Sequence, residues 1–142
     1  MMMTTLEEIK EMFSAESQPE AYTDFNHCEE CADHNETLKN YDRYALPLEE
    51  LNNPGWDPIC FVTPEAFRYL FPRLCELAYG EGNEYYLGQF LFHLENNVDL
   101  LTKAEKEKVY ELLVDIYSKN SVEIDANFDK SDIDRVSERL TT

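Results

Sequence analysis

The sequence predicts an all-α fold, a compact single-domain bundle of about five to seven helices, some of them short. Three observations predict this class. Apolar residues recur three and four positions apart along most of the 142 residues. Several of these stretches are preceded by a Thr that is followed by Pro at the next position or by Glu three positions later, which is typical of a helix start. No run of β-branched residues alternates with polar ones as a half-buried strand would. We therefore assign residues 1–142 to one helical domain, with residues 1–24 and 120–142 at its periphery.

Two helices are predicted before residue 41. The first is expected near residues 5 to 15, where Thr5 and Glu8 have the spacing of a capping box. The second is expected to follow an Asn26 cap, to begin around the first cysteine pair and to run toward residues 38–40. The apolar stripe of the first helix is Leu6, Ile9, Met12 and Phe13.

The next segment combines prolines with large apolar side chains. A short helix is predicted at residues 46–51, a turn at residues 52–55, and an ordered, partly buried loop at residues 56–61. We favour a buried Trp56 that closes one end of the core, because a single Trp in a small domain is usually mostly buried. The alternative is an exposed aromatic loop that recognises another protein.

A clear helix start follows, with Thr63 as N-cap and Pro64 in the first turn. Pro72 lies inside the apolar pattern and predicts a kink or a break into two consecutive helices. Gly80 ends the segment, and Gly80-Glu81-Gly82 is interpreted as a turn. The apolar face comprises Phe67, Leu70, Phe71, Leu74 and Leu77.

Three further helices are predicted in the remaining chain. Residues 85–94 are rich in Tyr, Leu and Phe, which indicates a central helix buried on most sides. Thr102 and Glu105 form a second capping box, and Ser131 is expected to cap a last helix. The apolar positions of the last two helices are Val109, Leu112, Leu113 and Ile116, then Ile133, Val136 and Leu140.

The charge restricts the partners. Thirty acidic and 12 basic residues give a net charge of -18. Such a surface repels phosphate backbones and anionic lipids, so we expect no direct nucleic-acid and no membrane partner. It attracts a basic protein partner. Mimicry of nucleic acid would require carboxylates spaced like phosphates on one face, and a linear sequence does not show that spacing.

The cellular compartment is expected to be the cytoplasm. No apolar run approaches the roughly 20 residues needed to span a bilayer. The first residues have neither the basic start nor the apolar middle of a signal peptide. In the cytoplasm the four cysteines should be reduced thiols or metal ligands.

The candidate metal site consists of Cys28, Cys31, His34 and Cys60. Two thiolates separated by two residues can chelate one soft ion, and His34 follows three residues later, which predicts zinc. Cys60 would supply the fourth ligand from the proline-rich loop, with Asp57 and His27 as alternatives. Two other interpretations stay open: Cys28 and Cys31 pack as small thiols in the core, or they form a redox pair near a helix N-terminus.

No set of residues indicates a catalytic mechanism, so we do not expect an enzyme and name no catalytic residue. His93 lies between large apolar residues, where a hydrogen-bonded histidine at the edge of the core is favoured over a base or ligand.

Four motifs resemble a known group of proteins. They are CEEC at residues 28–31, LPL at residues 46–48, TPEAFRY at residues 63–69 leading to Pro72, and FLFHL at residues 90–94. With these motifs the chain, from His27 to Ile116, resembles a family of small, uncharacterised bacterial proteins classed as a domain of unknown function. The resemblance implies a bacterial cytoplasmic origin and a helical fold, and it assigns no functional residue.

Two functional hypotheses follow. The first is a noncatalytic protein-binding module, such as an accessory, immunity-like or inhibitory factor, whose acidic surface meets a basic partner. The second is a zinc-binding protein or small metalloprotein that uses Cys28, Cys31 and His34. No other cofactor is expected.

Overall fold

Helices account for nearly all regular structure in the computed structural model, which describes residues 3–80 and 85–142. Within these ranges there are six α-helices and five short 3-10 helices, and no strand beyond one isolated bridge between Thr23 and Val62. The predicted all-α class is confirmed. The turn predicted at Gly80-Glu81-Gly82 lies partly outside the described residues.

The α-helices are α1 (Thr5–Met12), α2 (Glu29–Lys39), α3 (Pro64–Tyr79), α4 (Leu87–Asn97), α5 (Lys103–Ala126) and α6 (Lys130–Leu140). The 3-10 helices are η1 (Arg43–Ala45), η2 (Leu48–Glu50), η3 (Pro54–Trp56), η4 (Pro58–Phe61) and η5 (Val98–Leu100). Asn120 has non-helical dihedral angles, so α5 consists of two helical rods.

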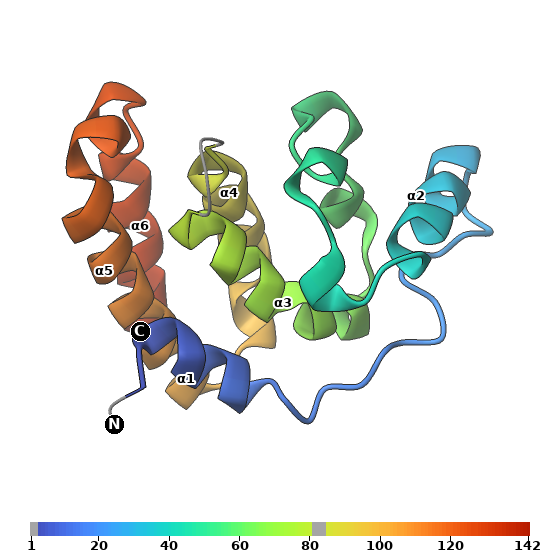
Figure 1. Ribbon diagram of the computed structural model, residues 1–142, viewed down its shortest axis with the longest axis horizontal. Helices are drawn as coiled ribbons and strands as arrows, with labels where there is room; N and C mark the ends of the chain where they lie inside the picture. Colours follow the sequence, from blue (N-terminus) through green and yellow to red (C-terminus); the bar gives the residue numbers. More distant parts are fainter. Residues whose placement is uncertain (1–2, 81–84) are drawn as a thin grey trace.

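The helices follow one another across the molecule, from α5 and α6 at one end to α2 at the other (Figure 1). Helix α6 packs on α5 and α4, α4 packs on α3, and α1 packs on α5 and α3. Helix α2 instead contacts η4, one of the short helices between η1 and α3. This arrangement brings the proline-rich segment between α2 and the rest of the bundle.

Several predicted helix starts are confirmed and others are corrected. Thr63 caps α3, and Thr102 forms the predicted capping box with Glu105 at the start of α5. The first capping box is Thr4 with Glu7, one residue before the predicted pair, because two consecutive Thr and two consecutive Glu fit the spacing equally well.

Two other caps also differ from the prediction. Helix α2 is capped by the sulfur of Cys28 rather than by Asn26, so the helix begins at Glu29. Helix α6 begins at Lys130 after Asp129, without a side-chain cap, and Ser131 already lies inside the helix.

Helix α3 runs without a break through Pro72, so of the two predicted alternatives, a kink or a division into two helices, the division is wrong. A proline removes one hydrogen bond of the helix ladder, and burial of the surrounding side chains compensates for that loss. Phe71, Leu74 and Cys75 are all fully buried around Pro72. Gly80 ends the helix as predicted, with a φ of 97° that favours glycine.

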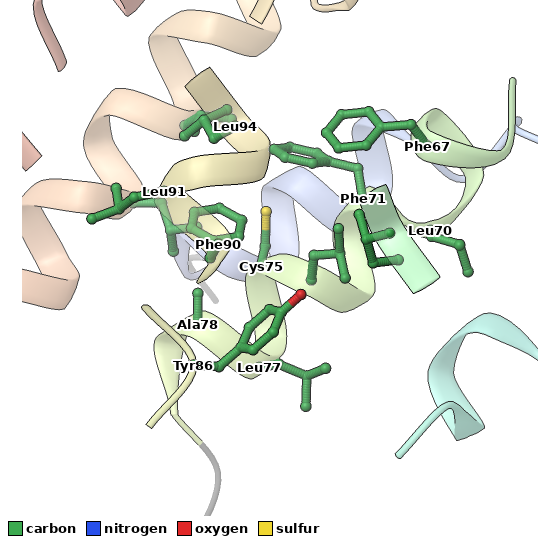
Figure 2. Packing of buried hydrophobic residues seen from close by; sticks show 14 of the residues in the cluster. Phe67, Leu70, Phe71, Cys75, Leu77, Ala78, Tyr86, Phe90, Leu91 and Leu94 are labelled. Atoms are coloured by element: carbon green, nitrogen blue, oxygen red, sulfur yellow. The ribbon is translucent and has the colours of Figure 1, made fainter. Parts of the chain in front are cut away.

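The core is centred on Phe71 of α3. Its ring centroid lies 5.4 Å from those of Phe13 and Phe67 and 6.0 Å from that of Phe90. Figure 2 shows these side chains of α3 and α4 facing one another. The predicted apolar faces of α3, α5 and α6 are buried.

Both outer segments contribute residues to the core, and Trp56 departs from the prediction. Phe13 and Val136, from the two segments expected at the periphery, are fully buried. Trp56 is 43% exposed, so the favoured prediction of a buried Trp is wrong. One face of its ring packs against His34, with the ring centroids 4.7 Å apart. In the described part of the chain, no helix is long and apolar enough to cross a membrane.

Candidate functional site

The N-terminus of α2 carries a cluster of two thiols and an imidazole, called here the Cys28 cluster: His27, Cys28 and Cys31. The sulfur of Cys28 accepts a hydrogen bond from the backbone N–H of Cys31 at 3.2 Å and lies 2.8 Å from the sulfur of Cys31. Nδ1 of His27 lies 3.6 Å from the sulfur of Cys31. One potential ligand atom from each residue lies within 4.8 Å of the others.

The two thiols of the cluster differ in exposure and in pKa. The thiol of Cys31, its backbone N–H and His27 all hydrogen-bond to the exposed Cys28, which lowers the pKa of Cys28. Cys31 is only 4% exposed, and its hydrogen bond with Cys28, together with burial, raises the pKa of Cys31 to about 11. Cys28 is therefore the more readily ionised thiol.

His34 does not join the two cysteines. Its ring is fully buried, with centroids 4.7 Å from Trp56 and 5.0 Å from Phe61. Its Nε2 lies 3.1 Å from Oε2 of Glu30. Helix α2 turns this side chain toward the aromatic residues of η3 and η4, and His27 takes the place predicted for it beside the thiols.

Cys60 belongs to a second group, called here the Asp57 cluster: Asp57, Cys60 and His93. Potential ligand atoms of the three residues also lie within 4.8 Å of one another. The predicted set of Cys28, Cys31, His34 and Cys60 is therefore not assembled as one site. The described residues contain two separate groups of three potential ligands instead.

Asp57 anchors the second cluster. It is the N-cap of η4, where its Oδ1 accepts the backbone N–H of Ile59 at 3.0 Å. Its Oδ2 lies 2.6 Å from Nε2 of His93 and accepts a hydrogen bond from Nε2 of Gln89 at 3.0 Å. Gln89 and His93 are one turn apart on α4, so both reach the same carboxylate. The prediction of a hydrogen-bonded His93 at the core edge is confirmed.

Cys60 is the exposed member of this cluster. Burial of its sulfur, followed by the negative charges of Asp57 and Glu30, raises the pKa of its thiol. The thiol lies at the wall of a cavity of about 340 Å³ lined by Pro54, Asp57, Cys60, Gly88, Gln89 and Phe92. The cluster is thus accessible from one side.

Sequence reasoning missed the pairing of Asp57 with His93. The two residues are 36 positions apart, and no periodic pattern connects a loop with a helix at that separation. The one local signal is Asp57 directly before Pro58, the arrangement of a capped helix start. This signal locates the carboxylate but not its partner.

No family model, curated protein or solved structure gives a significant match to the chain. The resemblance to an uncharacterised bacterial family stays a prediction.

Proposed function

We propose that the chain binds zinc at the Cys28 cluster. The observation that carries the proposal is the approach of two thiols and one imidazole to within 4.8 Å of one another. Sulfur and imidazole nitrogen are the donors that zinc prefers, and three protein ligands leave one coordination position for water or for a group from a partner. His27 replaces His34 in the set predicted from the sequence.

The protonation states favour this binding. Zinc requires deprotonated thiols, and the lowered pKa of Cys28 reduces the cost of the first thiolate. Cys31 gives up its proton to the solvent when the metal takes the place of the hydrogen bond between the sulfurs. Affinity should therefore fall as the pH is lowered.

The test is metal titration in a Cys60→Ser background, which removes the thiol of the Asp57 cluster. We expect one equivalent of zinc per chain, lost in Cys28→Ser and weakened roughly 10-fold or more in His27→Ala. His34→Gln is the matched comparison and should keep the affinity, provided that circular dichroism shows it folded. Less than about a tenth of an equivalent in the background protein would remove the proposal.

A second candidate function for the same cluster is dithiol redox exchange. It is favoured by the difference between the two thiols: Cys28 is exposed and has a lowered pKa, whereas Cys31 is buried and has a raised pKa. The Cys28 thiolate would attack a small-molecule disulfide, releasing one thiol, and Cys31 would then displace the second thiol to form the protein disulfide. A glutathione redox titration followed by mass spectrometry tests it, because the oxidised chain has lost two hydrogens. A mixture that stays reduced with excess oxidised glutathione excludes this function.

The proposal of a basic protein partner depends on the net charge of -18. Electrostatic binding weakens with salt, because ions screen exposed charges over about 10 Å at 0.1 M. We expect proteins recovered from cell lysate at low salt to dissociate at high salt. If no protein is retained at low salt, the electrostatic proposal fails.

A further inference from the structure

We propose that the Asp57 cluster is a second, independent metal site, in which Asp57, Cys60 and His93 bind a zinc-like divalent ion whose open position faces the neighbouring cavity. Nothing in this proposal requires metal at the Cys28 cluster. The ligand set is mixed, with one carboxylate oxygen, one thiolate and one imidazole nitrogen. Three protein ligands with a free position are typical of zinc sites that hold water.

The positions of the three donors need little change to admit an ion. Zinc lies about 2.0 to 2.3 Å from such ligands, which separates tetrahedral donors by roughly 3.3 to 3.6 Å. The 2.6 Å between Asp57 and His93 would open by less than about 1 Å when the ion replaces their hydrogen bond. Cys60 is exposed, so its side chain is free to rotate inward.

The surroundings of Asp57 hold the carboxylate in position. The backbone N–H of Ile59 binds Oδ1, and Gln89 binds Oδ2 while also donating to the carbonyl of Leu51 at 2.9 Å. Groups that orient metal ligands in this way are a regular part of metal sites. The α4 helix positions the backbone of His93, so the adjustment is limited to a small shift of the Asp57 and His93 side chains and to the orientation of Cys60.

The electrostatics favour a cation over a free thiolate. The carboxylates of Asp57 and Glu30 place negative charge near the sulfur of Cys60. Both negative groups attract a divalent ion. On binding, Cys60 releases one proton, and the charges of one carboxylate, one thiolate and one dication then cancel around the neutral imidazole.

The same facts count against a nucleophilic cysteine assisted by histidine. Such a mechanism needs a hydrogen bond between thiol and imidazole and a low thiol pKa. Among the described residues no hydrogen bond joins Cys60 to His93, whose Nε2 faces Asp57. The raised pKa of Cys60 also argues against an activated nucleophile.

The test uses Co²⁺ alone as the probe, in a Cys28→Ser/Cys31→Ser double variant. The remaining thiols are Cys60 and the fully buried Cys75. We expect one equivalent of Co²⁺ with a thiolate-to-cobalt absorption band and tetrahedral visible bands. Zn²⁺ should displace the cobalt and abolish the absorption.

Two variants in this background identify the ligands. Cys60 is exposed, so Cys60→Ser should remove the thiolate band without affecting folding. Asp57→Asn keeps the oxygen that caps η4 and should weaken Co²⁺ binding at least about 10-fold. Absence of cobalt binding in the double variant, or a thiolate band that survives Cys60→Ser, would overturn the second site. Neither result bears on zinc at the Cys28 cluster, which is titrated in the Cys60→Ser background.

Discussion

The sulfurs of Cys28 and Cys31 lie 2.8 Å apart, yet the pKa of the first thiol is lowered and that of the second is raised to about 11. The contrast follows from the hydrogen bond between the two sulfurs and from the different exposure of the two thiols. When Cys28 is ionised, the thiol of Cys31 donates to it and stabilises the Cys28 thiolate, while burial and this neighbouring thiolate oppose ionisation of Cys31. At the N-terminus of α2, the backbone N–H of Cys31 donates a further hydrogen bond to the sulfur of Cys28.

The first prediction concerns alkylation. In metal-free protein, Cys28 should react with iodoacetamide faster than Cys60, since both are exposed but only Cys28 has a lowered pKa. The reaction of Cys28 should also begin at lower pH. Peptide mass spectrometry across pH measures both rates. Cys31→Ala should slow the reaction of Cys28 at neutral pH, because it removes the side-chain hydrogen bond that contributes most to the lowered pKa of Cys28. Faster labelling of Cys60 would contradict the assignment.

Helices were easier to predict from the sequence than contacts. The apolar face of α3 and the capping boxes are local patterns, so Phe67, Leu70 and Thr102 lie where the sequence predicts. The candidate site depends on side-chain direction. His34 has helical spacing from Cys31, but its ring packs on Trp56, a contact made by a distant segment.

The second prediction tests the ion pair that ties α3 to α5. Arg68 donates two hydrogen bonds of 2.8 Å to the buried carboxylate of Glu105. Glu105→Gln keeps the size of the side chain and its capping oxygen but removes the charge. We expect a loss of about 2 kcal/mol in the free energy of unfolding near neutral pH, measured by urea denaturation. The exposed Glu107→Gln is the matched control and should change little.

The third prediction concerns how the stability lost in Glu105→Gln depends on pH. Burial opposes ionisation of Glu105, but the hydrogen bonds from Arg68 and Thr102 outweigh it and lower the pKa. A lowered folded-state pKa contributes stability above the unfolded pKa, and this contribution is lost as the pH falls through the folded value. The difference in the free energy of unfolding between wild type and Glu105→Gln should therefore become smaller below about pH 4. A difference that is constant from neutral to acid pH would show that charge is not its source.

The fourth prediction compares two phenylalanines. Phe71 is fully buried among three other rings, whereas Phe92 is 57% exposed on α4. Phe71→Ala should lower the free energy of unfolding by about 3 to 5 kcal/mol, through lost burial and the cavity left behind. Phe92→Ala should change it by about 0.5 kcal/mol or less. Urea denaturation measures both, and similar losses would mean that the core is not centred on Phe71.

The fifth prediction concerns Phe128, which follows α5 with a φ of 61° and a side chain that is 85% exposed. The backbone N–H of Phe128 bonds to the carbonyl of Asp125, and that of Asp129 bonds to Ile124, the two bonds of a Schellman helix end. Glycine is favoured at this position because the left-handed conformation costs other residues about 1 kcal/mol.

Phe128→Gly should therefore raise the free energy of unfolding by about 1 kcal/mol and the melting temperature by roughly 3 °C. The matched control is Val122→Gly, equally exposed but inside α5. There glycine should lower the free energy by about 0.5 kcal/mol, since it loses more backbone entropy in a helix than valine does. Opposite signs at two equally exposed apolar positions would separate the backbone effect from the removal of surface apolar area. If both variants were destabilised, Phe128 would not hold the left-handed conformation in solution, and α5 would end differently.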